Sequence, residues 1–182
     1  LVVFFFRGLF LVCYPLLFND GNGRDSDPTD PGDWVSDADL ADPEFEDCET
    51  TDSTWHGTSV TGILVANANN AQYTAGLDWR AKVLPVRVMG KCGGYDSDIL
   101  DGVAWAAGLL VPGVPANPNV AQVINQSLGG LDDRTCSPGY DAMLARALSP
   151  TGPRAIVAAA GNDDGAADLS VPSSCPSTIA VA

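Results

Sequence analysis

His56 is the only histidine in the 182 residues, and it is the side chain best suited to move protons at neutral pH. An unperturbed imidazole titrates near neutrality, so it can accept a proton and return it within one catalytic cycle. His56 lies where an Asp-rich region gives way to an apolar-periodic run, and Gly57 follows it directly. A glycine there lets the backbone approach closely while a helix holds the ring. A lone histidine is more often structural than catalytic, so His56 alone does not establish a site.

Two further stretches end an apolar run with small and polar residues. They are VINQSLGG at 123–130 and IVAAAGN at 156–162. Ligands of parallel sheets bind beyond the carboxyl ends of the strands, and small residues there leave room for a peptide to lie alongside as an added strand. Gly129 and Gly161 are also residues that ordinary turns require, and this simpler interpretation stays open while the two stretches are considered alone.

In this order and at this spacing, the WHGTSVTGILVA stretch at 55–66 and the two stretches above resemble the subtilisin-like serine proteases, or subtilases. The resemblance extends from about Asn19 to Ala182. It implies hydrolysis of peptide bonds in polypeptide substrates outside the cell, through a serine nucleophile. It implies no required cofactor.

The resemblance also implies roles for individual residues. His56 is expected to be the general base, and Asn162 to donate its side-chain amide to the oxyanion of a tetrahedral intermediate. The other residues are expected to contact the substrate. Ser127, Leu128 and Gly129 would pair with its backbone as a strand, and Gly93, Gly94 and Tyr95 would form the opposite wall of the cleft. Ala160 and Gly161 would line the pocket for a substrate side chain.

Two catalytic residues of the family have no convincing counterpart. The resemblance implies an aspartate in an Asp-Thr-Gly or Asp-Ser-Gly block near the start, and residues 1–18 contain neither block. Asp20 is a weak candidate, because its neighbours match an insertion loop better. The nucleophile block, Gly-Thr-Ser-Met-Ala, is expected beyond Ala182, and Ser59 is no substitute because it lies on the same predicted helical turn as His56. We therefore expect a partial peptidase domain at 19–182 that is inactive, or nearly so, and marginally stable by itself.

Residues 1–18 form an apolar segment of doubtful origin. The end of a signal peptide, a membrane segment and a buried strand are all open interpretations. The segment is short for a membrane span, Arg7 and Pro15 interrupt it, and it shows no clear cleavage site.

Strands and helices alternate after His56. We expect helices at 57–67, 96–110 and 140–148, and strands at 81–89, 120–128, 154–160 and 178–182. Such alternation predicts an α/β fold, a three-layer domain with a mostly parallel sheet and helices on both faces. The resemblance implies that this domain is incomplete at both ends.

The charge balance excludes one class of partner. Nine basic against 23 acidic residues give a net charge of −14. Nucleic-acid binding needs a basic footprint, so no nucleic acid is expected. The acidic surplus fits a secreted protein kept soluble by charge, a protein that holds Ca²⁺, or a plain solvated surface. We expect a monomer, and no membrane association of the mature domain.

The five cysteines are an odd number. The resemblance implies the pairs Cys48–Cys92 and Cys136–Cys175, with Cys13 left over. Each bridge would close a long loop and contribute about 4 kcal/mol, in an oxidising compartment. Four buried free thiols are the alternative.

Residues 19–54 are predicted to form a long polar loop rich in Asp, Gly and Pro. The Asp spacing indicates Ca²⁺ as a structural ion. It does not match an EF-hand, because Arg24 stands where a ligand belongs.

The function expected from these observations is a serine endopeptidase as the parent activity. The alternative is a non-catalytic, peptide-binding relative that keeps the cleft without a nucleophile. An unrelated α/β domain with chance matches is a third interpretation, which a sheet order that separates His56 from Asn162 would favour.

Overall fold

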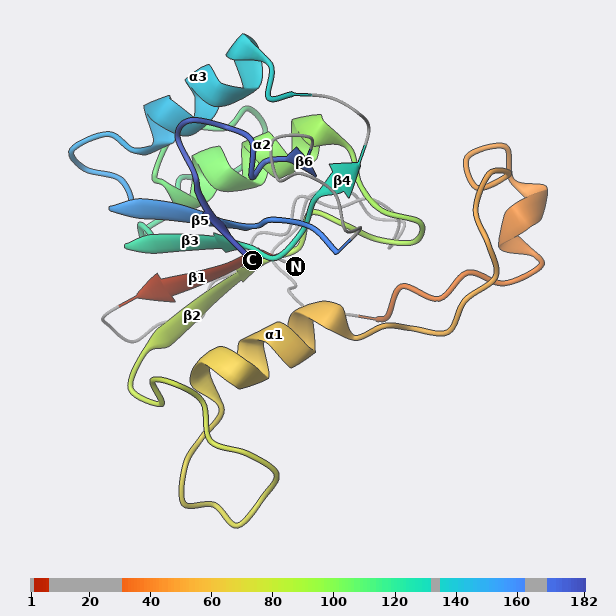
Figure 1. Cartoon of the computed structure of the whole chain (residues 1–182), viewed down its shortest axis with the longest axis horizontal. Helices are drawn as coiled ribbons and strands as arrows, with labels where there is room; N and C mark the ends of the chain where they lie inside the picture. Colours follow the sequence, from red (N-terminus) through yellow and green to blue (C-terminus); the bar gives the residue numbers. More distant parts are fainter. Residues whose placement is uncertain (1, 7–30, 132–134, 163–169) are drawn as a thin grey trace.

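The computed structural model describes residues 2–6, 31–131, 135–162 and 170–182 (Figure 1). Asp20 and the Asp-rich stretch up to Asp30 lie outside the described residues. The elements are the strands β1 (Val2–Phe6), β2 (Lys82–Val86), β3 (Val123–Gln126), β4 (Gly130–Leu131), β5 (Ala155–Ala159), β6 (Ser170–Val171) and β7 (Ile179–Val181), the helices α1 (His56–Val65), α2 (Asp96–Ala106) and α3 (Pro138–Ala147), and the short 3-10 helix η1 (Asp39–Ala41).

The main sheet has five strands in the order β2-β1-β3-β5-β7. β3 pairs in parallel with β5, and β5 in parallel with β7. β1 is antiparallel to both β2 and β3, so β2 runs in the same direction as β3. The helices α2 and α3 connect these like-directed strands, as crossover connections of parallel strands require. The predicted α/β class and the mostly parallel sheet are confirmed.

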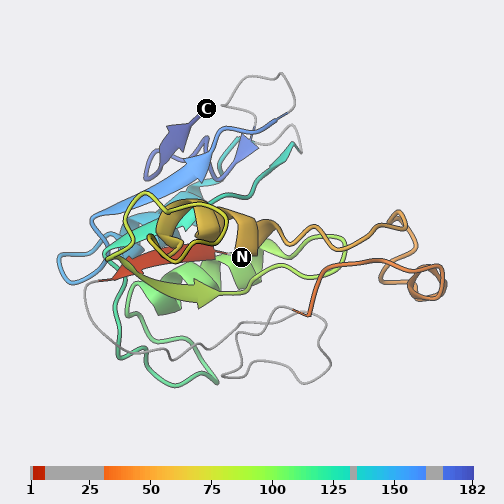
Figure 2. The same cartoon turned by 90° about the horizontal axis from the view of Figure 1, so that it is seen from below.

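Helices cover both faces of this sheet, but unequally. α2 and α3 lie side by side on one face, and α1 lies alone on the other (Figures 1 and 2). The hydrophobic core lies under α2 and α3, where seven large apolar side chains are almost completely buried: Val86, Val88, Val103, Trp105, Ile124, Leu144 and Ile156. On α1, by contrast, only Gly57 is buried and Ile63 is 62% exposed. Burial of apolar side chains between the sheet and the two helices α2 and α3 therefore contributes most to the stability of the fold.

The predicted helix at 96–110 ends four residues early, at Ala106, for a local reason. Gly108 adopts φ +83°, a left-handed conformation that favours glycine. The N–H of Leu109 then donates to the carbonyl of Ala104 at 2.9 Å, which closes the helix end as in a Schellman motif. The strands are also shorter than predicted, while the helix predicted at 57–67 is confirmed within two residues.

A second, two-stranded sheet pairs β4 with β6 and was not predicted. Three residues separate its strand β4 from β3, and the Cys136–Cys175 disulfide joins the residues before α3 to those after β6. The small sheet and this disulfide therefore fix the chain that leaves β3.

β1 is the strand whose direction is reversed. Its residues Val2 and Val3 pair with Val86 and Asn125, so the start of β1 lies at the edge of the sheet where β2 and β3 end. β1 therefore ends at the opposite edge, where β2 and β3 begin. Among the described residues, no helix is both long and apolar enough to cross a membrane.

The core position of Leu144 gives a stability prediction. Its side chain is fully buried on α3, so Leu144→Ala removes apolar contacts and leaves a cavity. We expect a loss of about 2–5 kcal/mol in the free energy of unfolding, measured by chemical denaturation. The control Leu77→Ala, at a side chain that is 79% exposed, should change it by no more than about 0.5 kcal/mol. Equal losses in the two variants would contradict this location of the core.

Candidate active site

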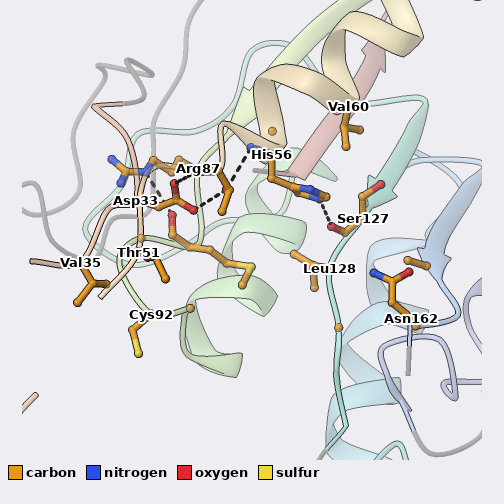
Figure 3. A pocket seen from close by; sticks show the side chains of 18 of the residues that line it. Asp33, Val35, Thr51, His56, Val60, Arg87, Cys92, Ser127, Leu128 and Asn162 are labelled. Carbon is orange, nitrogen blue, oxygen red and sulfur yellow. Dashed lines mark hydrogen bonds between the residues drawn. The ribbon is translucent and has the colours of Figure 1, made fainter. Parts of the chain in front are cut away.

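A cleft of about 810 Å³ opens at the edge of the sheet where β3 and β5 end, beside the first residue of α1 (Figure 3). Segments that are far apart in the sequence meet there. Its lining residues are Asp33, Val35, Glu49, Thr51, Thr54, His56, Gly57, Val60, Arg87, Met89, Gly90, Cys92, Gly93, Ser127, Leu128, Gly129, Ala159, Gly161, Asn162 and Ser170.

The imidazole of His56 is turned toward the chain that leaves β3 (Figure 3). Its Nε2 lies 2.8 Å from the backbone oxygen of Ser127. A carbonyl oxygen can only accept, so Nε2 carries the hydrogen of this bond. In the neutral ring Nδ1 is then the unprotonated nitrogen. Before Nε2 can accept a proton, the ring must release the Ser127 carbonyl.

The backbone at His56 is held through Thr54. The Thr54 N–H donates to Asp33 Oδ1 at 2.6 Å, and the Thr54 hydroxyl donates to Asp33 Oδ2 at 2.6 Å. The N–H of His56 in turn donates to the Thr54 hydroxyl oxygen at 3.3 Å. The two oxygens of one carboxylate therefore bind the residue that caps the first turn of α1.

Asp33 is ionised in this arrangement. Partial burial raises the pKa of its carboxyl, but the hydrogen bonds from Thr54 and the charge of Arg87 outweigh burial, so the pKa lies below its ordinary value. Asp33 and Arg87 lie next to each other on one side of the cleft (Figure 3).

Arg87 is a buried cation, with 4% of its surface exposed. Its Nε donates to the Met89 carbonyl at 3.2 Å, and Nη2 donates to the Gly32 carbonyl at 3.4 Å. In the part of the chain that the structure describes, Nη1 has no hydrogen-bond partner. Arg87 thus joins the end of β2 to the residue that precedes Asp33.

The turn at residues 90–93 forms another wall of the cleft. The N–H of Gly90 donates to the Gly93 carbonyl at 2.8 Å, and Cys92 and Gly93 both have positive φ. Three contacts attach this turn to the acidic segment at 32–54. They are the Cys48–Cys92 disulfide, an ion pair of 2.7 Å between Lys91 and Asp39, and Lys91 Nζ at 4.9 Å from the centroid of the Trp34 ring. Both disulfides that the resemblance implies are present in the structure.

The far wall is made of small residues. A Cβ on Gly129 would lie 3.0 Å from the Ser170 hydroxyl and 3.2 Å from the Val171 carbonyl, so a larger side chain would have to displace β6 or enter the cleft. Gly161 has φ +109°, and Asn162 beside it lies beyond the Ser127–Leu128 segment as seen from His56 (Figure 3).

Most of the residues that the sequence singles out meet in this cleft. Those that line it are His56, Gly93, Ser127, Leu128, Gly129, Gly161 and Asn162. Gly94, Tyr95 and Ala160 are not lining residues. Tyr95 precedes α2 and is 53% exposed, and the N–H of Ala160 donates to the Val181 carbonyl at 2.8 Å.

Sequence reasoning missed Asp33, Thr54 and Arg87. Arg87 carries a signal that could have been used, because it is the one charge in the apolar run VLPVRVM at 83–89. A charge in a buried strand requires a partner. Asp33 stands among many acidic residues, and nothing in the sequence distinguishes it.

One group of three potential metal-ligating side chains lies together in the described part of the chain, namely Cys136, Asp141 and Cys175. The two sulfurs bond to each other, so they offer no thiolate to a metal. Ca²⁺ takes six to eight oxygen ligands, and this group does not fit it.

Comparisons with known proteins show what this chain is similar to. The model of the Subtilase family matches residues 18–182. The extracellular basic protease of Dichelobacter nodosus is 45% identical over 162 residues, which are 89% of this chain and 26% of that protein. The extracellular protease of Xanthomonas campestris pv. campestris is 45% identical over 163 residues, 90% of this chain and 27% of that protein.

A solved structure of a protease from Pseudoalteromonas arctica PAMC 21717 superposes with a TM-score of 0.82 at 43% identity. The match covers 94% of this chain and 50% of that one. The chain thus spans about a quarter of the length of the two curated relatives and half of the solved structure.

The lowered pKa of Asp33 predicts how its contribution to stability depends on pH. Because the folded-state pKa lies below the ordinary value of 3.8, the stabilisation is complete above about pH 5 and is lost as the pH falls through 3.8 and below. The difference in unfolding free energy between the wild type and Asp33→Asn should therefore be constant from pH 7 to about 5 and shrink toward pH 3. Denaturant titrations at each pH measure it.

The matched comparison is Asp33→Asn made in a Thr54→Val background, where the hydroxyl donor to Asp33 is already absent. The pH dependence should be weaker there. If the difference in unfolding free energy caused by Asp33→Asn stays the same from pH 7 to pH 3 in both backgrounds, the lowered pKa of Asp33 is refuted.

Proposed function

The chain belongs to the Subtilase family of peptidases, and on this basis we propose that the protein is a secreted serine endopeptidase that hydrolyses peptide bonds in polypeptides. The observation that carries the proposal is the cleft itself. It combines an imidazole at the start of α1 with the Asn162 amide and with the small-residue chain at Ser127–Gly129.

The proposed mechanism assigns a different task to each wall. An extended peptide lies along Ser127–Gly129 and pairs with it as an added strand. His56 takes the proton of the nucleophilic serine and then gives it to the leaving amine. The side-chain amide of Asn162 donates a hydrogen bond to the oxyanion that develops on the scissile carbonyl. The His56 ring must first leave the Ser127 carbonyl, since Nε2 donates to it at 2.8 Å.

The nucleophile is not among the groups bonded to His56. Among the described residues, Ser127 is the serine that forms a hydrogen bond with the imidazole, and it does so through its backbone oxygen. Ser59 lies on the same helix as His56, which leaves no cleft between base and nucleophile. We therefore propose that the 182-residue chain alone binds peptides without cleaving them.

Secretion is proposed from two observations. The D. nodosus and X. campestris relatives are named as extracellular proteases, and the chain carries two disulfides, which persist in oxidising compartments. The proposed mechanism requires no catalytic cofactor. A structural Ca²⁺ in the Asp-rich part of residues 19–54 and a monomeric state remain predictions from the sequence.

Peptide binding by the isolated chain is the first prediction of this function. An extended fluorescent peptide should bind saturably, as measured by anisotropy, and stay intact by mass spectrometry. Gly129→Val should weaken binding at least about tenfold, because its side chain meets β6 or fills the cleft. The control Gly139→Val, in open space on α3, should leave the affinity unchanged. Unchanged binding in Gly129→Val would contradict the assigned cleft.

Catalysis is tested in the full-length product of the gene that encodes this chain. His56→Ala should lower kcat/KM by several orders of magnitude, as loss of a general base does. Asn162→Ala should lower kcat by about 10²–10³, the loss known for an oxyanion-hole asparagine of a subtilisin. A full-length product that binds peptides but never cleaves them would instead establish the non-catalytic, peptide-binding function.

A further inference from the structure

We propose that Asp33 is a positioning residue for His56, which it holds through the hydroxyl of Thr54. The inference takes the catalytic role of His56 from the proposed function, but the contacts that support it are independent of that role. Asp33 acts here on the backbone of His56, and no hydrogen bond joins the Asp33 carboxylate to the imidazole among the described residues.

The start of α1 lacks an ordinary cap. Helix N-termini leave backbone N–H groups free, and a Ser, Thr, Asp or Asn side chain at the N-cap usually accepts from them. The N-cap residue of α1 is Trp55, whose side chain makes no such bond. The hydroxyl oxygen of Thr54, one residue earlier, accepts from the His56 N–H instead.

Asp33 determines which way the Thr54 hydroxyl points. A hydroxyl has one hydrogen to donate, and here the hydrogen goes to Asp33 Oδ2 at 2.6 Å. The oxygen lone pairs are then free for the His56 N–H. The second carboxylate oxygen accepts from the Thr54 backbone N–H, also at 2.6 Å, so both the backbone and the side chain of Thr54 are fixed. Short hydrogen bonds to an ionised carboxylate are stronger than neutral ones.

The backbone is held on both sides of Asp33. The carbonyl of Gly32 accepts from the buried guanidinium of Arg87. Val35 pairs with Thr51 in a two-way backbone bridge, with both N···O distances at 3.0 Å. The segments 32–35 and 51–54 are therefore tied together next to α1, and the Arg87 contact ties the first of them to the end of β2.

Trp55 makes this anchoring necessary. It has φ 50° and ψ 28°, a left-handed conformation that L-residues with a large side chain rarely adopt. On its helix side, the Trp55 carbonyl accepts from the Ser59 N–H at 3.0 Å. On the other side, the restraint comes from Asp33 acting on Thr54. If that restraint is removed, Trp55 can return to negative φ, which redirects His56 and moves its ring away from the Ser127 carbonyl.

The test uses the full 182-residue chain and needs no proteolytic activity. With a single histidine, the ring protons of His56 give unambiguous NMR signals, and their cross-peaks to Ser127 and Leu128 report the ring position. Thr54→Val, which removes only the hydroxyl, and Asp33→Ala should each reduce these cross-peaks several-fold. Thr54→Ser, which restores the hydroxyl, should retain them. The charge control is Asp52→Asn, an exposed carboxylate two residues from Thr54, and it should also retain them.

Each outcome decides the proposal. Intact cross-peaks in a folded Thr54→Val variant overturn it, even if stability has fallen, because a purely structural role would reduce stability and leave the ring in place. Loss of the cross-peaks in Thr54→Ser or in Asp52→Asn also overturns it. If Asp33→Ala does not fold, the Thr54 pair decides alone. A full-length protein without peptidase activity would contradict the proposed function and leave this test valid.

Discussion

The parallel pairing of β3 with β5 is the constraint on which the rest of the site depends. Its register joins Val123 to Ala155 and Gln126 to Ala158, so the two strands end at the same edge of the sheet. The chain at Ser127–Gly129 and the chain at Gly161–Asn162 must then leave side by side, and their small residues keep the space between them open. A shift of one strand by one residue would turn its own buried isoleucine, Ile124 on β3 or Ile156 on β5, out of the core. The same burial that stabilises the sheet therefore fixes the two walls of the cleft.

The third wall comes from outside the sheet and is held by other means. The acidic segment at 32–54 carries little core of its own, with Val35 and Phe45 as its buried apolar residues. Covalent and charged contacts replace hydrophobic packing here, namely the Cys48–Cys92 disulfide, the Lys91–Asp39 ion pair and the buried Arg87. A single ion pair near the surface contributes little, so we expect the disulfide to contribute more than the Lys91–Asp39 pair to holding this segment.

The sequence predicted the parts of the site that follow from local patterns. His56 at a helix start, Ser127 at the end of one strand and Asn162 after another could all be expected, because an apolar run that ends in small or polar residues indicates a strand end. Asp33 could not, because its contact with Thr54 spans 21 residues and that of Arg87 with Gly32 spans 55. The direction of β1 was equally hidden, since an apolar run such as VVFFF indicates a strand but not which way the strand runs. Gly108 was a visible signal that the prediction of a longer α2 overlooked.

In the proposed mechanism, the contact between His56 and Ser127 gives a reason for an anchor on the backbone of His56 rather than on its ring. A protonated imidazole can donate from both nitrogens, so it can keep the Ser127 bond, whereas a base that uses Nε2 must give that bond up. One hydrogen bond contributes a net of about 0.5–1.5 kcal/mol, so the ring can break its bond to Ser127 readily by rotating in the open cleft. A rigid contact on the ring itself would oppose this rotation. The hold that Thr54 and Asp33 exert on the His56 N–H leaves the ring free to turn while it keeps the pivot at the mouth of the cleft.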